Sequence, residues 1–496
     1  MIGRLVRILY LDIDCLRPDH LGCYGYHRDT SPNIDKLAKE GLRFDNVYVS
    51  DAPCLPSRSA LFSQRFGAKT GIVNHGGARA APYSDGVGRG FGDSFGRTSW
   101  MRAFRDAGYF TASVSPFAER HAAWHFYAGF RDIVNTGKRG LEIADEVFQS
   151  ASDWLDRNGK NDSWVLHVNF WDPHTPYRAP KDFGEPFASQ ALPNWYSNEV
   201  RKQHFSQPGP HSAQESMGFD DESNQWAKKF PRQPFVIDSM DEARRMFDGY
   251  DTGVAYADKY CGLVLEKLEA LGIRDSTAIL LSSDHGENLG ELNVYGDHQT
   301  ADQFTCRVPA ILSYPGVTEK YAGQVDSRLH YQIDVGATLT NLAGGKPFPN
   351  WDSKEFSQTL GSKEGGRSEL VLSQAAWACQ RSVRFESDGK SWLWLRTYHD
   401  AYHGYDDEML FDLGSDKHEE INVARENKAI CEKAKHLLDD WLAKNLGGPQ
   451  KDPLDEVLRE GGPFHVRGKL GTYLTRLRET GREDWAARLA SKYGID

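Results

Sequence analysis

Long hydrophobic runs are missing from this sequence of 496 residues. At the N-terminus only four apolar residues, Ile8 to Leu11, precede Asp12, and four are too few for the hydrophobic core of a signal peptide. No stretch approaches the ~18 consecutive apolar residues of a membrane-spanning helix. We therefore expect a protein with no membrane segment.

Cysteines are few and widely scattered. There are seven of them, an odd number, and no Cys-x-x-Cys pair occurs. This usage favours a reduced setting, and we expect a cytoplasmic protein.

Basic runs are missing as well. The chain has 59 Lys and Arg against 70 Asp and Glu, which gives a net charge of −11 and a pI near 5.9. This balance argues against nucleic acid as a partner. It still permits a small anionic substrate, because cationic side chains can line one pocket of an acidic protein.

What the sequence does contain is an alternation of short apolar strands with helices. We expect strands at 7–14, 42–49, 109–114, 164–170 and 278–283, and helices at 32–40, 54–64, 100–108 and 256–271. The alternation predicts an α/β fold, a large, mostly parallel sheet sandwiched by helices. In such a sheet, ligands bind at the carboxyl ends of the strands.

The character of the chain changes twice. Residues 1–375 are expected to form the catalytic α/β domain, with 178–240 as an irregular insertion over the site. Residues 376–450 predict a small C-terminal antiparallel sheet plus helix, because a hairpin pattern around Asp388-Gly389 precedes a helical one. Residues 451–496 carry a further amphipathic pattern and predict a C-terminal helical arm.

The segment Cys54-Leu55-Pro56-Ser57-Arg58 carries the decisive chemistry. A cysteine at a helix N-terminus lies in a positive potential that activates it, although a lone cysteine is more often a buried structural thiol. The motif Cys-x-Pro-Ser-Arg before a helix resembles the signature of the sulfatase family. In that family the cysteine is converted to formylglycine, whose hydrated aldehyde is the nucleophile.

The resemblance covers residues 8–445. Segments 14–25, 31–44, 282–287 and 307–309 are similar to family motifs, and 410–413 with Asn422 resemble its C-terminal subdomain. The resemblance implies an alkaline-phosphatase-like fold, a divalent cation, and a formylglycine-generating maturase as a partner. It also implies that Arg58 holds the hydrated aldehyde.

Residues at two strand ends predict the cation site. Asp14, Asp284 and His285 are suitable ligands, with Cys54 beside them, although an Asp at a strand end is often only a helix cap. The family often has two adjacent aspartates in its first motif, and here the second is replaced by Cys15. Three alternatives stay open for the missing ligand: Cys15, the nearby Asp12, or neither. Calcium is the default ion, and a thiolate would favour Mn²⁺ or Zn²⁺.

Histidines and one arginine complete the predicted site. His174 resembles the family's acid for the leaving group, and His298 falls where the family places a Lys or His that binds the ester. A lysine that the family commonly has near Pro116 is absent here. The candidates to replace it are Arg120, His121 and His125, and His75 is a further candidate for the lining of the pocket.

The resulting prediction is hydrolysis of a sulfate monoester, from a sulfated sugar or an aryl ester. An alternative is a phosphonate monoester or phosphodiester hydrolase with the same formylglycine, because those enzymes often have a single Asp in the first metal motif. A third reading is an unmodified, non-enzymatic binding protein on the same fold. The arm is expected to pack on its own core, to close the site, or to form a homo-oligomer, in which case His465 would approach a neighbour's pocket.

Overall fold

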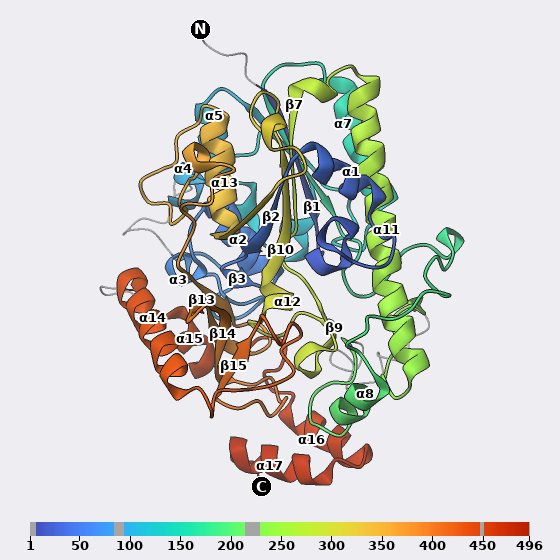
Figure 1. Ribbon diagram of the computed structural model, residues 1–496, viewed down its shortest axis with the longest axis vertical. Coiled ribbons are helices and arrows are strands. Elements are labelled where there is room, and N and C mark those ends of the chain that lie inside the picture. Colours follow the sequence, from blue (N-terminus) through green and yellow to red (C-terminus); the bar gives the residue numbers. More distant parts are fainter. Residues whose placement is uncertain (1–5, 84–93, 214–228, 447–450, 496) are drawn as a thin grey trace.

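The computed structural model describes residues 6–83, 94–213, 229–446 and 451–495. Its main feature is an eight-stranded sheet with the order β11-β2-β10-β7-β1-β6-β4-β5, in which β10 runs against the other strands (Figure 1). The strands are β1 (Arg7–Ile13), β2 (Leu42–Tyr48), β4 (Phe110–Val114), β5 (Asp132–Val134), β6 (Trp164–Phe170), β7 (Thr277–Ser282), β10 (Arg307–Ser313) and β11 (Val325–Tyr331). The predicted α/β fold with a mostly parallel sheet is confirmed.

Helices cover both faces of this sheet because the central strands are apolar on both sides. Along β1, Ile8 and Tyr10 belong to one core, and Leu9 and Leu11 to the other. The first core lies under α2 (Cys54–Ser63), α5 (Trp100–Asp106) and α13 (Gln332–Leu342). The second lies under α1 (Pro32–Glu40), α7 (Ala144–Asn158) and α11 (Met240–Ala270) (Figure 1).

The sequence analysis placed the start of α11 too late. It predicted a helix from residue 256, whereas α11 begins at Met240. The Ser239 side chain accepts a hydrogen bond from the Glu242 N–H, which caps the helix there. The first part of α11 carries polar residues that contact other segments. The apolar periodicity that predicts a helix is therefore weak there.

A second, five-stranded sheet has the order β15-β14-β13-β12-β3. Its strands are β3 (Asp51–Ala52), β12 (Glu369–Gln374), β13 (Cys379–Ser387), β14 (Lys390–His399) and β15 (Glu408–Asp412), and α14 (Lys428–Leu446) packs on it. The expected division at residues 375 and 376 falls inside this sheet, between β12 and β13. Strand β3 ends at Ala52 and Pro53 then leads into Cys54, so the pairing of β3 with β12 also fixes the chain that enters α2.

The predicted insertion at 178–240 contains α8 (Asn198–Phe205) within largely irregular chain, and its residues 214–228 lie outside the described residues. Shorter elements complete the chain: α3 (Gly67–Thr70), α4 (Ser94–Thr98), α6 (Phe117–Arg120), β8 (Asn288–Leu289), β9 (Tyr295–Asp297) and α12 (Gln303–Cys306). In the described part of the chain, no helix combines the length and apolar character needed to cross a membrane.

The C-terminal arm contains α15 (Pro453–Arg459), α16 (Leu470–Glu479) and α17 (Glu483–Tyr493) and packs on its own chain (Figure 1). Tyr473 and Leu477 join a buried cluster with Trp377 and Tyr402. At the start of the arm, the Asp452 carboxylate accepts two hydrogen bonds, of 2.5 and 2.7 Å, from the guanidinium of a buried arginine, Arg381.

Candidate active site

The predicted catalytic residues follow three neighbouring strands of the large sheet. Strands β7, β1 and β6 lie side by side and run parallel, and Asp284, Asp14 and His174 follow their carboxyl ends. The Asp14 N–H donates to the Phe170 carbonyl over 2.9 Å, which ties the ends of β1 and β6 together. Parallel pairing thus brings three sequence-distant segments to one edge of the sheet.

Cys54 begins α2 beside this edge. Its side chain is 1% exposed, and its Sγ atom lies 3.0 Å from His285 Nε2. One turn along the helix, the Ser57 hydroxyl donates to the Asp284 carbonyl over 2.5 Å. Burial raises the pKa of the Cys54 thiol well above its usual range, and the Asp14 and Asp284 carboxylates raise it further. The unmodified side chain is therefore a neutral thiol, which suits a precursor better than a cysteine nucleophile.

Four of the predicted cation ligands, Asp14, Cys54, Asp284 and His285, form one compact buried group. One donor atom of each lies within 4.8 Å of the others. His285 Nδ1 donates to the Gly286 carbonyl over 2.8 Å, which leaves Nε2 free to accept. Asp14 Oδ1 is buried and has no hydrogen-bond partner among the described residues. A divalent cation would satisfy both His285 Nε2 and Asp14 Oδ1, so this donor set fits the predicted ion.

Arg58 lies at the centre of the acidic residues. Its Nε donates to Asp12 over 2.9 Å, and its Nη1 donates to Asp14 over 2.9 Å and to Asp284 over 2.5 Å. All four side chains are at most 1% exposed. One guanidinium faces three carboxylates, so if all three are ionised the group has an excess of negative charge. That excess favours a second cation in the same place.

Asp12 and Cys15, the two alternatives for an additional ligand, have different surroundings. The Asp12 carboxylate accepts from Arg58 and also lies 3.1 Å from His167 Nε2. Cys15 Sγ lies 3.8 Å from both His285 Nδ1 and His298 Nδ1. Burial raises the pKa of the Cys15 thiol well above its usual range. Cys15 belongs to compact groups of metal-ligating types, whereas no such group among the described residues includes Asp12.

His174 and His298 are brought together with Cys54, with donor atoms of the three within 4.8 Å of one another. His174 Nδ1 donates to the Thr175 carbonyl, so Nε2, which lies 4.0 Å from Asp14 Oδ1, is the nitrogen that can exchange a proton. Burial lowers the pKa of His174 and of His298 well below the usual range. Both imidazoles are therefore neutral before a ligand binds.

Arg120, His121 and His75 lie nearer to the surface, and each is half-buried. The Arg120 guanidinium lies 5.1 Å from the centre of the Trp171 ring, and the rings of His121 and His75 are 5.0 Å apart. His75 Nε2 accepts from the Leu55 N–H over 3.4 Å, which connects His75 to the first turn of α2. These three candidates thus form an outer layer above the nucleophile position.

His125 has a different environment from the other candidates. Its Nε2 is 2.9 Å from the Ser59 hydroxyl, and its ring packs on Phe95 with centroids 4.9 Å apart. Burial alone lowers its pKa, to about 4. Among the described residues, its contacts do not join it to the group around Cys54.

Two further histidines were not recognised as parts of this site. His167 lies within an apolar strand opposite Tyr10 and contacts Asp12, and a histidine inside such a strand was the available signal. His465 comes from the C-terminal arm, and its Nε2 lies 2.9 Å from His75 Nδ1. The sequence analysis considered His465 only for a neighbouring subunit, whereas the structure has it beside the site of its own chain.

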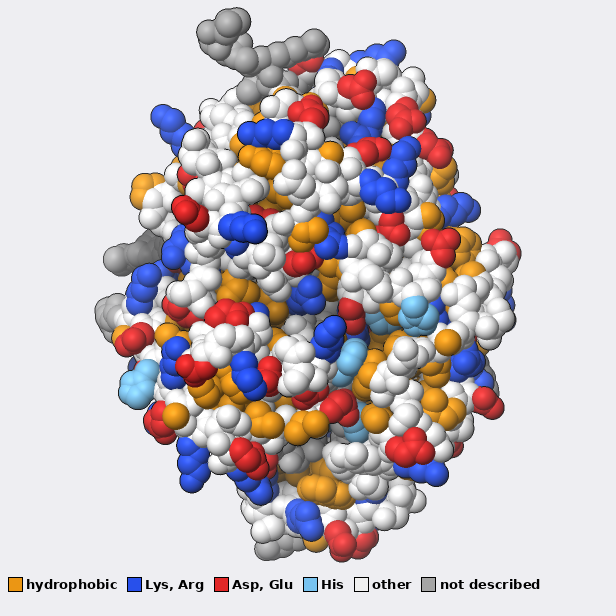
Figure 2. All heavy atoms as spheres, in the orientation of Figure 1, with side chains coloured by type: hydrophobic (Ala, Val, Ile, Leu, Met, Phe, Trp, Pro, Cys, Tyr) orange, Lys and Arg blue, Asp and Glu red, His pale blue; other side chains and the backbone are white. Residues whose placement is uncertain are grey.

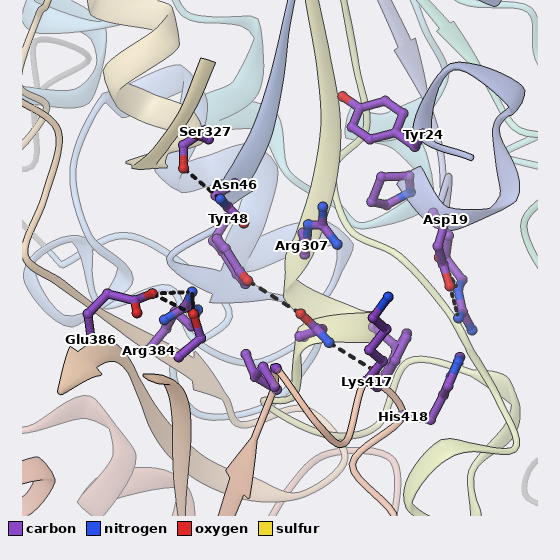
Figure 3. A pocket seen from close by; sticks show the side chains of 17 residues that line it. Asp19, Tyr24, Asn46, Tyr48, Arg307, Ser327, Arg384, Glu386, Lys417 and His418 are labelled. Carbon is purple, nitrogen blue, oxygen red and sulfur yellow. Dashed lines mark hydrogen bonds and ion pairs between the residues drawn. The ribbon is translucent and has the colours of Figure 1, made fainter. Parts of the chain in front are cut away.

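A separate pocket of about 570 Å³ lies between the two sheets (Figure 3). Arg307 and Lys417 point into it, and Tyr48 and Arg384 line its other side (Figure 3). The space-filling view shows a hollowed central region with cationic and histidine side chains around it (Figure 2). None of the 17 residues that line the pocket is a predicted catalytic or metal-binding residue. This pocket therefore lacks the predicted catalytic chemistry, and the candidate active site is the one with Cys54.

The fold and the group around Cys54 define a hydrolase of the alkaline-phosphatase-like superfamily. The sulfatase family model matches residues 7–345, more than half of the chain. The chain belongs to the sulfatase family, whose members hydrolyse sulfate esters. The predicted family is thereby confirmed.

Individual relatives are distant but cover most of the chain. A choline-sulfatase from Rhizobium meliloti is 25% identical over 82% of this chain and 79% of its own. The solved structure of a protein in complex with its substrate D-glucosamine-2-N,6-O-disulfate has a TM-score of 0.69 and 18% identity, and covers 90% of this chain and 99% of that chain. The phosphonate monoester hydrolase of Agrobacterium radiobacter has a TM-score of 0.66 and 19% identity over 89% and 96%. At these identities, the two structures establish the fold.

Proposed function

We propose that this protein hydrolyses the sulfate monoester of a sugar, with a formylglycine made from Cys54 as the nucleophile. The observation that carries the proposal is the compact buried group of Asp14, Cys54, Asp284 and His285 at the carboxyl ends of β1 and β7. A separate maturase would have to oxidise the Cys54 thiol to the aldehyde. All seven cysteines are free, which supports the proposed reduced, cytoplasmic setting.

A divalent cation bound by Asp14, Asp284 and His285 would supply positive charge that lowers the pKa of a coordinated hydroxyl and stabilises a transferring sulfuryl group. Ca²⁺ prefers oxygen ligands, and it remains our first candidate because both carboxylates suit it. The imidazole of His285 and the nearby Cys15 thiol give Mn²⁺ or Zn²⁺ as alternatives.

The side chains of the protein divide the remaining tasks. Arg58 holds the carboxylates of Asp14 and Asp284 in fixed positions and adds positive charge beside the nucleophile. His174 Nε2 is in position to exchange a proton with the leaving oxygen, because its Nδ1 is occupied by Thr175. Binding of the anionic ester raises the proton affinity of this neutral imidazole. His298, in the same group, is the second base and the ester-binding residue.

Phosphonate monoester or phosphodiester hydrolysis is the second candidate function. Two observations favour it: the structural likeness to a phosphonate monoester hydrolase, and Cys15 in place of a second aspartate. The same formylglycine and cation would serve either substrate, so the preference depends on the groups that surround the ester.

The test combines mass spectrometry with a substrate panel. Protein produced together with a maturase is digested, and the peptide with Cys54 is examined for the aldehyde. Turnover is then measured on glucosamine 6-sulfate, 4-nitrophenyl sulfate and a phenylphosphonate monoester. We expect the aldehyde and the highest kcat/KM on the sugar sulfate. A fastest phosphonate reaction would favour the second function, and an unmodified thiol with no turnover would favour a binding protein.

A further inference from the structure

The C-terminal arm brings a histidine to the candidate active site of its own chain. His465 lies between α15 and α16, and its backbone N–H donates to the Ala376 carbonyl over 3.0 Å. Its ring stacks on Trp377, with centroids 4.4 Å apart and the planes 17° from parallel. The small sheet and the arm therefore hold this imidazole in one orientation.

A chain of hydrogen bonds determines which nitrogen of His465 carries the proton. The Leu55 N–H, in the first turn of α2, donates to His75 Nε2 over 3.4 Å. His75 must therefore carry its proton on Nδ1, which lies 2.9 Å from His465 Nε2 and donates to it. His465 Nε2 is an acceptor, so its proton is on Nδ1. Within the described ranges, the hydrogen bond of the His465 ring runs through Nε2, so the Nδ1–H is available to a ligand or to solvent.

Neighbouring groups keep His465 neutral. Burial, together with the positive charges of Lys469 and Arg120, lowers its pKa to about 3. A neutral N–H donor is suited to an uncharged oxygen, whereas a sulfate would be better matched by the charged Arg58 and by a cation held at Asp14 and Asp284. His465 is also half-buried, while Cys54 is 1% exposed, so the imidazole is the more accessible of the two to solvent.

Two more polar atoms beside His465 lack partners. His121 Nε2 and Trp377 Nε1 are buried, and neither has a hydrogen-bond partner within the described ranges. The His121 ring lies 5.0 Å from that of His75, so one unpartnered atom adjoins each end of the His75–His465 pair. Buried polar groups normally have partners, and such a group of exceptions indicates a place for a polar ligand.

We infer that His465 Nδ1 donates a hydrogen bond to a hydroxyl group of the alcohol half of the ester, so that the C-terminal arm selects hydroxyl-bearing alcohols in the same subunit. The inference rests on the proposed sulfate ester hydrolysis. It assigns to the arm a subsite for the leaving alcohol, and it explains why His75 connects the arm to the helix that starts at Cys54.

The experiment compares His465→Ala and His465→Gln on two substrates. Glucosamine 6-sulfate carries hydroxyl groups on its alcohol half, and 4-nitrophenyl sulfate carries none. We expect His465→Ala to raise KM for the sugar sulfate by about tenfold, the loss of one hydrogen bond, and to change KM for the nitrophenyl ester by less than about twofold. His465→Gln keeps an N–H donor and should recover part of the affinity. Arg467→Ala, two residues away with its charge paired to Glu460, is the matched control and should behave as wild type.

Equal losses on both substrates, or no loss on either, would overturn the inference. A calorimetric titration tests the inference without turnover, so that its failure can be told apart from failure of the proposed function. Glucosamine 6-sulfate is titrated into Cys54→Ala and into Cys54→Ala/His465→Ala. We expect about tenfold weaker binding in the double variant even if the wild type turns over neither ester. Equal affinity of the two variants, or no binding by either, contradicts the inference.

Discussion

Arg58 Nη1 donates a hydrogen bond to the carboxylate of Asp14 over 2.9 Å, so the arginine of the cysteine motif and the first predicted cation ligand are direct partners. The contact joins α2 to the residue that follows β1, and the two partners lie 44 positions apart in the sequence. It places a permanent positive charge against a buried carboxylate that still has one unsatisfied oxygen among the described residues. This oxygen of Asp14 is therefore available to a cation without loss of the contact with Arg58.

Cys54→Ala should abolish turnover and preserve the fold. The substitution removes the precursor of the nucleophile but deletes a single sulfur atom from the core, at a cost of about 1 kcal/mol in the free energy of unfolding. Cys261→Ala, at another buried cysteine in α11, is the matched control and should keep full activity. Steady-state kinetics and thermal unfolding of both variants test this, and near wild-type turnover by Cys54→Ala would refute the proposed nucleophile.

Removal of the cation should abolish activity reversibly. Asp284→Asn and His285→Ala each remove one donor from the compact group, so the purified variants should contain much less bound metal than the wild type. Asp412→Asn, a carboxylate paired with Lys390 in the small sheet, should retain it. Elemental analysis gives the metal content and the identity of the ion. Full activity of metal-free wild type would contradict the cation site.

The strand-end residues could be predicted from the sequence because each belongs to a short motif with its own local signal. Asp14, Asp284 and His174 follow apolar strands, and parallel pairing brings such positions to one edge. The position of His125 could not be predicted. Two histidines, His121 and His125, follow β4, and only tertiary packing determines that His125 turns toward Ser59.

Contacts between distant segments explain the other differences. The His75–His465 pair joins residues 390 positions apart, and no local pattern encodes such a contact. Likewise, amphipathic spacing predicted that the arm must pack on something, but not that its partners would be Trp377 and Tyr402. The family resemblance predicted the chemical roles of the site residues, and the structure shows which side chains they contact.

His174→Ala should slow poor leaving groups far more than good ones. A sugar alcohol needs a proton as it departs, whereas a nitrophenolate leaves almost unaided, so general acid catalysis matters mainly for the sugar. We expect kcat to fall by about 10²–10⁴-fold on glucosamine 6-sulfate and by much less on 4-nitrophenyl sulfate. His125→Ala, at the histidine whose contacts lie elsewhere, serves as the control with little change on either ester. Equal losses for His174→Ala on the two esters would transfer the acid role to His298.

The arm should stabilise the monomeric unit whether or not the protein forms oligomers. Leu477 in α16 is fully buried in the cluster with Trp377 and Tyr402, so Leu477→Ala should lower the free energy of unfolding by about 2–5 kcal/mol. Ile421→Ala, at a side chain that is 63% exposed, should change it by less than about 0.5 kcal/mol. Chemical denaturation measures both effects, and light scattering at several protein concentrations reports the assembly state. If Leu477→Ala dissociates an oligomer and leaves the unfolding of the subunit unchanged, the arm serves assembly and its packing on its own core contributes little.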